Sequence, residues 1–251
     1  MGALHEGHEA LIQAARNEAG IVIVSIFVNP LQFGPSEDFG RYPRTLPQDL
    51  TICERNGADL VFAPSVDEIY PLPQITFVEV TRVSEQLCGK FRPGHFRGVT
   101  TVVSKLLNIV QPHRAYFGEK DMQQLLVIRR MVADLNLPVT IVGVPTVREA
   151  DGLALSSRNK YLSAEERKAA PALYRGLQEA AQRIRSGESD PSKIRQAGLA
   201  VVKVSALTRV EYFEIVDPDE LQPVVSVSGP VRIAGAIWLG PTRLIDNVFI
   251  R

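Results

Sequence analysis

Two of the chain's four histidines, His5 and His8, stand three residues apart in the opening stretch MGALHEGH. The segment from Glu6 to Asn17 carries apolar residues at helical spacing, so both histidines fall at the start of an expected helix. A helix N-terminus presents unpaired N–H groups and a partial positive charge, which suit a phosphate. Imidazoles placed there can donate hydrogen bonds to an oxyanion. Alone, the pair is also typical of capping or surface histidines.

Two further polar segments come directly after expected strands, where ligands of open α/β sheets bind. In FGEKDMQQ, Lys120 offers a cation to phosphate, Asp121 can accept from a ribose or cap the next helix, and Gln124 lies one turn further on. In VNPLQFGPSEDFGRYPR, Asn29 and Gln32 precede a loop rich in proline and glycine. Its acidic residues, Glu37 and Asp38, have an alternative interpretation as a solvated loop.

A third polar segment, ALSSRN, places Arg158 beside small hydroxyl side chains in a loop. An arginine in such a loop can contact phosphates when the loop closes. The common phosphate and metal motifs are absent from the sequence: there is no GxGxxG, no GxxxxGK[ST] and no HExxH. The candidate site is therefore neither a dinucleotide fingerprint, nor a Walker P-loop, nor a zinc-protease helix.

The elements that must position these residues alternate between strand and helix in the first half of the chain. We expect strands at IVIVSIFV (21–28, buried on both faces), DLVFAP, ITFVEV (75–80), AYFG and PVTIVGVP, separated by helices of about 10 to 15 residues. This order predicts parallel βαβ units, hence a Rossmann-like doubly wound sheet.

After about Val147 the pattern changes. Two helices, about 164–186 and 191–206, precede four short strands at 210–217, 222–228, 231–240 and 242–250. Helices followed by neighbouring strands predict a smaller α+β domain with antiparallel strands. We therefore expect a Rossmann-like nucleotide-binding domain over residues 1–146 and a C-terminal lid domain over 147–251.

Composition limits the partners. The 251 residues carry 28 basic and 28 acidic side chains, so no net charge favours nucleic acid or a membrane surface. Cys53 and Cys88 stand in unlike contexts and give neither a disulfide framework nor a metal-ligand spacing. The longest apolar run is too short to span a bilayer, and no secretion signal is visible, so we expect a cytoplasmic protein.

Taken together and in this order, MGALHEGH, SIFVNPLQFGPSEDFGRYPR, RPGHFRGVTTVVSKLLNIVQP, AYFGEKDMQQL and VREADGLALSSRNKYL closely resemble the pantothenate synthetase (pantoate–β-alanine ligase) family. That family belongs to the nucleotidyltransferase superfamily with the HxGH motif. The resemblance implies that the pantoate carboxylate attacks the α-phosphorus of ATP, giving pantoyl adenylate and pyrophosphate. The amine of β-alanine then attacks the acyl carbon, giving pantothenate and AMP. ATP is the co-substrate in this scheme, and Mg²⁺ assists with it.

The resemblance also implies the site residues. His8 would have the proton-donor role, and His5, Lys120 and Arg158 would meet the phosphates with it. Gln32 and Gln124 would hold pantoate, with Gln32 also near β-alanine, for which Asp38 and Tyr42 are neighbourhood candidates. No residue is assigned as a protein ligand to a metal. The ATP site would comprise Met1, Gly2, Ala3, Leu4, His5, Glu6, Gly7, His8, Gly118, Glu119, Lys120, Asp121, Val147, Leu155, Ser156, Ser157 and Arg158.

The family further implies a homodimer, and some of its members are fused to a cytidylate kinase in a longer chain, although no P-loop occurs in these residues. Two alternatives stay open: another small-molecule nucleotidyltransferase, and an inactive N-terminally truncated fragment.

The fragment alternative arises because a strand ending in Pro-Thr precedes the HxGH helix in the family and lies in the middle of the sheet. We hypothesise that Met1 is an internal methionine taken for a start, and expect this strand to be missing. Each buried unpaired backbone group would cost about 1–3 kcal/mol. A chain that starts at Met1 is therefore expected to be poorly stable or to fill the gap with another edge.

Overall fold

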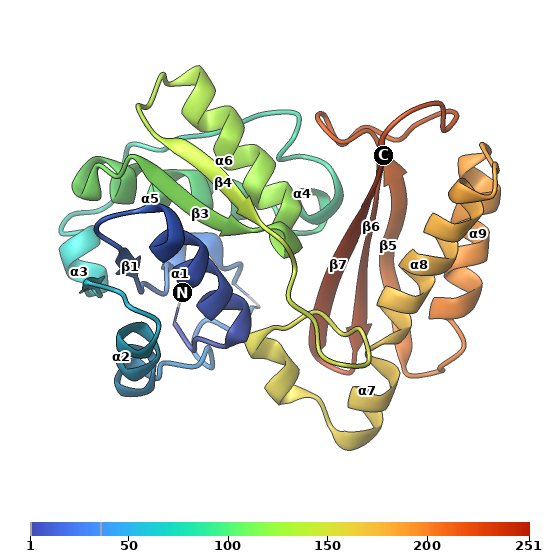
Figure 1. Cartoon of the computed structure of the whole chain (residues 1–251), viewed down its shortest axis with the longest axis horizontal. Coiled ribbons are helices and arrows are strands. Elements are labelled where there is room, and N and C mark those ends of the chain that lie inside the picture. The colour runs from blue at the N-terminus through green and yellow to red at the C-terminus, as the bar shows by residue number, and fades with distance from the viewer. Residues whose placement is uncertain (1, 36) are drawn as a thin grey trace. The chain divides into compact units, whose positions relative to one another are not determined.

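The computed structural model of the chain describes residues 2–35 and 37–251. Its elements alternate between helix and strand up to β4 and then run as helices followed by strands (Figure 1). In chain order they are α1 (Glu6–Glu18), β1 (Ile23–Ser25), η1 (Pro30–Gln32), α2 (Leu46–Arg55), β2 (Leu60–Phe62), α3 (Val66–Ile69), α4 (Leu87–Phe91), α5 (His95–Val110), β3 (Arg114–Gly118), η2 (Glu119–Asp121), α6 (Met122–Asp134), β4 (Thr140–Val144), η3 (Ser157–Tyr161), α7 (Ala164–Ala169), α8 (Ala172–Arg185), α9 (Pro191–Val202), β5 (Thr208–Val216), β6 (Val231–Leu239) and β7 (Thr242–Ile250).

The chain forms two compact units, and each is described here by itself. The first contains the chain up to Glu85 and Gly89–Pro145, and the second contains Gln86–Cys88 and Thr146–Arg251. The expected α/β class is confirmed, with parallel strands in the first unit and an antiparallel sheet in the second. No helix in the described part of the chain combines the length and the apolar character needed to cross a bilayer.

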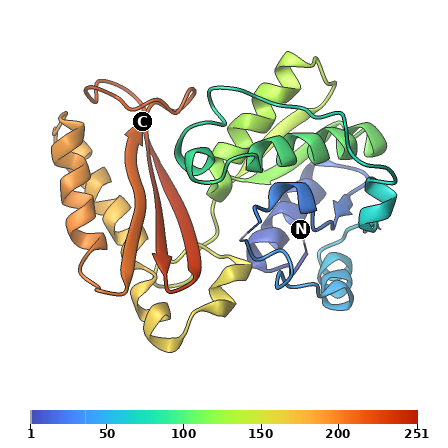
Figure 2. The same cartoon turned by 180° about the vertical axis from the view of Figure 1, so that it is seen from behind.

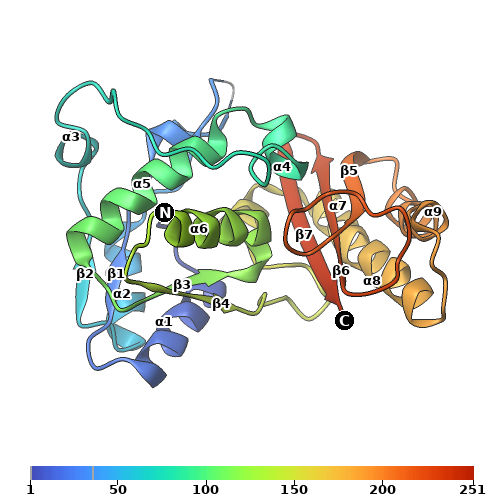
Figure 3. The same ribbon diagram turned by 90° about the horizontal axis from the view of Figure 1, so that it is seen from above.

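The parallel strands of the first unit form two separate pairs, β1 with β2 and β3 with β4. Figure 3 shows α1 on one face of β3 and β4, and α5 and α6 on the other face, as expected for a doubly wound unit. Leu4, Ile12, Ala15, Val22, Ile26 and Cys53 form a core that joins α1 to the strand region and α2. The buried face of α1 therefore fixes where its N-terminus lies.

A cavity of about 820 Å³ separates the two strand pairs and is lined by α1, β1, α5 and β3. Among the described residues no strand joins β1 to β3, so the expected gap in the sheet is present. The gap also corrects one expectation, that residues 21–28 form a strand buried on both faces. β1 has three residues, and Ile21 and Ile23 are 70% and 39% exposed because no neighbouring strand covers that edge.

Two other expected strands are wrong. Residues 75–80 run extended without a ladder, because side chains of α5 take its place: the Thr101 hydroxyl accepts from Val78 N at 3.1 Å and Thr100 Oγ1 donates to Val78 O. In residues 222–228 only an isolated bridge joins Pro223 to Val216, since proline offers no N–H and Val225 is almost fully exposed.

The second unit has a three-stranded antiparallel sheet in the order β5-β6-β7, with α8 and α9 on one face (Figure 2). The expected helix over 164–186 is divided into α7 and α8. Pro171 stands at the break because it lacks an N–H and clashes with the preceding turn. The core of this unit contains Leu177, Ile194, Phe213, Ile233 and Ile237, all fully buried.

Candidate functional site

The backbone ahead of α1 makes a tight left-handed turn that is held by Asp49. Gly2 and Ala3 have φ values of 90° and 52°. The amides of Ala3 and Leu4 donate to Asp49 Oδ2 and Oδ1 at 2.9 and 2.8 Å, and Asp49 is 1% exposed. A Cβ on Gly2 would stand 3.2 Å from Asp49 Oδ2 and from Ile26, so glycine fits both the φ and the space. Asp49 thereby sets the position from which the histidines project.

Backbone N–H groups fix the tautomers of both histidines. His5 caps α1: its Nδ1 accepts from Gly7 N at 3.2 Å. His8 Nδ1 accepts from His5 N at 3.3 Å, which completes a capping box. A ring nitrogen that accepts carries no proton, so each neutral ring is protonated at Nε2. Both histidines therefore offer an Nε2–H donor, with ring centroids 4.1 Å apart.

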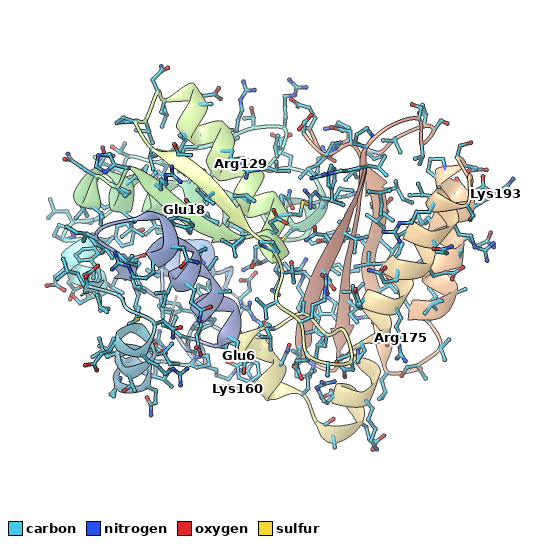
Figure 4. All side chains as sticks on the ribbon, in the orientation of Figure 1. Glu6, Glu18, Arg129, Lys160, Arg175 and Lys193 are labelled. Atoms are coloured by element: carbon cyan, nitrogen blue, oxygen red, sulfur yellow. The ribbon has the colours of Figure 1, made fainter. Side chains whose placement is uncertain are left out.

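Burial, followed by the nearby His5 and Lys120, holds the pKa of His8 well below its ordinary value. The lowered pKa favours the neutral ring, which offers its Nε2–H as a hydrogen-bond donor. The charge of Lys120 is thus near enough to His8 to lower the pKa of its ring. Glu6 and Glu18, labelled in Figure 4, mark the two ends of α1, with Glu6 at the histidine end.

Lys120 lies in η2, directly after the carboxyl end of β3. Its ammonium is 3.8 Å from the Asp121 carboxylate. Asp121 is the N-cap residue of α6 but makes no side-chain capping bond, so the capping alternative for this residue is wrong. Gln124 is half-buried on the first turn of α6, whereas its buried neighbour Gln123 donates to Val83 O at 2.8 Å.

Gln32 ends η1 and has its side-chain amide oriented by Asn29. Asn29 Oδ1 accepts from Leu31 N at 3.3 Å and from the Tyr70 hydroxyl at 2.9 Å, so the Nδ2 group of the Asn29 side chain is the donor. Asn29 Nδ2 donates to Gly98 O at 3.0 Å and to Gln32 Oε1 at 3.2 Å. The oxygen of Gln32 therefore faces Asn29, and its NH₂ group is turned away as a donor.

Gly98 allows α5 to approach this loop backbone to backbone. A Cβ at this position would lie 2.2 Å from Leu31 O and 2.7 Å from Gln32 N. Beside this contact, His95 at the start of α5 meets Gln32 O at 2.8 Å and also feels the charge of Asp121. The structure thus brings Gln32 to His95 and His5 to His8, and the charges of Asp121 and Lys120 act on the pKa of His95 and His8, respectively.

In the second unit, the polar loop after β4 is tied down at both ends. Leu155 N donates to Val147 O at 3.0 Å, and Ser156 Oγ accepts from Arg158 N at 3.2 Å as the cap of η3. Arg148 donates from both terminal nitrogens to Asp246, a carboxylate buried to 4% exposure. Ser157 is buried, and Lys160, labelled in Figure 4, belongs to the same short helix.

Some expectations had other outcomes. Met1 lies outside the described residues. Tyr42 is buried with its ring 5.8 Å from that of Phe33, and its place near β-alanine stays a prediction. The solvated-loop interpretation of Glu37 is wrong, because its carboxylate receives the guanidinium of Arg92.

Sequence reasoning assigned no role to Asp49, Arg92 or His95. Their partners are 3 to 63 residues away in the chain, so local patterns did not reveal them.

Comparisons with known proteins agree with this geometry. The family model described as pantoate-beta-alanine ligase matches residues 1–249. Over 250 residues the chain is 56% identical to the pantothenate synthetase of Moorella thermoacetica, covering all of this chain and 88% of that protein. It is 52% identical to that of Pelotomaculum thermopropionicum, covering 89% of it.

Solved structures give the same result. A crystal structure of pantothenate synthetase from Thermus thermophilus superposes with a TM-score of 0.96 at 51% identity, over 99% of this chain and 90% of that one. A pantoate-beta-alanine ligase from Francisella tularensis, complexed with beta-gamma ATP and beta-alanine, superposes with a TM-score of 0.79 at 36% identity, over 99% and 86%. Fold, site and relatives together define an α/β enzyme of the ligase class. The chain belongs to the pantoate–β-alanine ligase family.

Proposed function

We propose that this enzyme condenses pantoate with β-alanine at the expense of ATP, through a pantoyl adenylate. The observation that carries the proposal is the family match over residues 1–249, together with a relative complexed with an ATP compound and β-alanine. In the first step a carboxylate oxygen of pantoate forms a bond to the α-phosphorus and pyrophosphate leaves. In the second, the amine of β-alanine attacks the acyl carbon and AMP leaves, giving pantothenate.

The first unit supplies groups that suit this chemistry without a protein nucleophile, because the carboxylate of the substrate itself attacks. Aligning two bound reactants can lower a barrier by about 7–11 kcal/mol. The Nε2–H donors of His5 and His8 and the ammonium of Lys120 would stabilise charge on the phosphate oxygens. We propose that His8 donates a hydrogen bond from its Nε2–H to the phosphate.

The remaining assignments are also proposals. Gln32 and Gln124 hold pantoate, Gln32 with its NH₂ group toward the carboxylate. The residues that bind ATP are Gly2–His8 and Gly118–Asp121 in the first unit and Val147 and Leu155–Arg158 in the second. On this basis residues 1–146 form the nucleotide- and pantoate-binding domain and 147–251 the C-terminal domain.

The residues present fit Mg²⁺ as an ion that enters the site bound to ATP. Among the described residues, no three carboxylate, histidine or cysteine side chains converge as a metal site. Mg²⁺ is commonly held through phosphates, waters and one or two carboxylates. Asp121, beside Lys120, is placed to contribute such a carboxylate. When bound, the ion neutralises phosphate charge.

A coupled assay for AMP formation tests the proposal. AMP should form only when ATP, pantoate and β-alanine are present together, and pantoate alone should support exchange of labelled pyrophosphate into ATP. Exchange without pantoate would favour another nucleotidyltransferase. No AMP from this chain, but AMP from one extended at the N-terminus, would favour the truncated-fragment alternative.

The proposal also covers the oligomeric state and the cellular compartment. We propose a homodimer, which sedimentation equilibrium tests directly. We also propose the cytoplasm as the site of reaction, because Cys53 and Cys88 stand in unlike contexts of the sequence and give no disulfide framework. The proposed function includes no kinase activity, whether or not the chain is fused to a cytidylate kinase.

A further inference from the structure

A largely buried polar cluster lies behind Gln32 and has no part in the proposed reaction. It consists of Glu37, Arg92 and His95. The Arg92 and Glu37 side chains are 15% and 24% exposed. Arg92 Nε donates to Glu37 Oε1 at 2.7 Å and its Nη2 donates to Oε2, which makes a two-bond fork. Glu37 thus fixes the plane of the guanidinium.

The fixed guanidinium and His95 converge on one atom, the backbone carbonyl oxygen of Gln32. His95 Nδ1 lies 2.8 Å from it and Arg92 Nη2 lies 3.3 Å from it. Arg92 Nη1 also lies 3.1 Å from His95 Nε2. Two donors from separate side chains therefore hold the residue expected to bind pantoate.

The chemistry of these partners sets the state of His95. A carbonyl only accepts, so Nδ1 carries the proton, and a guanidinium only donates, so Nε2 carries the lone pair. Burial and the adjacent Arg92 lower the pKa of His95 to about 4, against the opposing effects of Gln32 O, Glu37 and Asp121. The ring is therefore a neutral bridge between Arg92 and Gln32.

We propose that Arg92 and His95 are positioning residues for the acid substrate. They hold the main chain of Gln32, while Asn29 orients its amide, so that the NH₂ group points at the pantoate carboxylate. This inference rests on the proposed function, since it assigns pantoate to Gln32. A shift of about 1 Å in a positioning group can cost about 100-fold in rate.

Three variants and two matched controls test the proposal. His95→Phe keeps the ring volume and removes both hydrogen bonds, and Arg92→Lys keeps the charge and removes the fork. His95→Asn places an amide N–H near the former Nδ1–H and should restore the bond to Gln32 O. The controls are His113→Phe, at an exposed histidine, and Arg114→Lys, in the exposed ion pair with Glu18.

We expect His95→Phe and Arg92→Lys to lower kcat/KM for pantoate by about 10- to 100-fold, with the KM for ATP unchanged. His95→Asn should recover most of the loss, and the controls should match the parent chain. Equal losses for ATP and pantoate, or a lower melting temperature with unchanged kcat/KM, would show a merely structural cluster and overturn the proposal. If His95→Phe does not fold, Arg92→Lys decides the question by the same criteria.

Calorimetric titration with pantoate in the absence of ATP separates this proposal from the proposed function. If the parent chain binds no pantoate and shows no pantoate-dependent exchange, the proposed function fails. If the parent binds pantoate and both His95→Phe and Arg92→Lys bind it equally well, the positioning role fails while the proposed function stands.

Discussion

Asp49 offers the sharpest test of how the turn before α1 is built. Its carboxylate accepts from two consecutive buried amides, Ala3 N and Leu4 N, and also from the Thr45 hydroxyl at 3.2 Å. Asp49→Asn keeps the shape but replaces one acceptor oxygen with an NH₂ group. One amide then loses its acceptor at a cost of about 1–3 kcal/mol, and the other loses a charge-assisted bond worth about 1 kcal/mol more than a neutral one.

The expected loss is therefore about 2–4 kcal/mol in the local stability of this turn. Because each 1.4 kcal/mol is a factor of ten, amide exchange over residues 2–8 should become about 30- to 1,000-fold faster. The histidines follow this turn directly, so AMP formation should also fall, by up to about 100-fold.

Hydrogen–deuterium exchange by mass spectrometry, with the AMP assay on the same samples, measures both effects. Asp134→Asn is the matched control, since that carboxylate is exposed and pairs with Arg130 of its own helix. Its exchange over residues 2–8 should equal that of the parent chain. Unchanged exchange in Asp49→Asn, or an equal change in Asp134→Asn, would refute the reasoning.

Four further outcomes are expected. Gln124→Arg should bind pantoate but form the adenylate more slowly, because an arginine stabilises the ground-state carboxylate; an unchanged single-turnover rate contradicts this. Arg158→Ala should slow pyrophosphate exchange far more than it weakens pantoate binding in calorimetry, whereas equal effects would indicate a structural loop. As the pH falls from 6.5 to about 4, His95 should lower the unfolding free energy of the parent chain by about 1.4 kcal/mol per pH unit, because the unfolded histidine takes up a proton before the folded one does. Urea titrations of His95→Asn should lack this pH-dependent loss. An N-terminal extension of six β-branched residues and Pro-Thr should raise the melting temperature by filling the 820 Å³ cavity, and a Gly-Ser extension should not.

Much of the first unit's architecture was predictable from periodicity. The helix at 6–17 and the strands at β2, β3 and β4 follow from local apolar spacing and from glycine or proline at their ends. Residues 75–80 show where that reasoning fails. Their alternation predicts a strand, but the Thr100 and Thr101 hydroxyls of α5 bond the backbone of Val78 instead, and no local pattern reveals partners 22 and 23 residues away.

The candidate site divides in the same way. His5, His8 and Lys120 became candidates because their types and their places after a strand or before a helix suggest phosphate binding, whereas the pantoate role of Gln32 came from the family resemblance. Asp49 was not a candidate, because an aspartate inside a helix of ordinary sequence carries no mark of the two amides that it accepts from 45 and 46 residues away. Glu37 was interpreted as solvated because its arginine partner is 55 residues distant.

The sequence by itself determined the α/β class, the order of the elements and the chemistry on offer, since these depend on residue type and on spacing within one or two turns. Only the tertiary structure decided the protonated nitrogen of His5, His8 and His95, the direction of the Gln32 amide and the open edge between β1 and β3. These depend on which donor meets which acceptor across long loops. Hydrogen-bond direction is settled by pairing in space, whereas the capacity to donate or accept is already present in the residue.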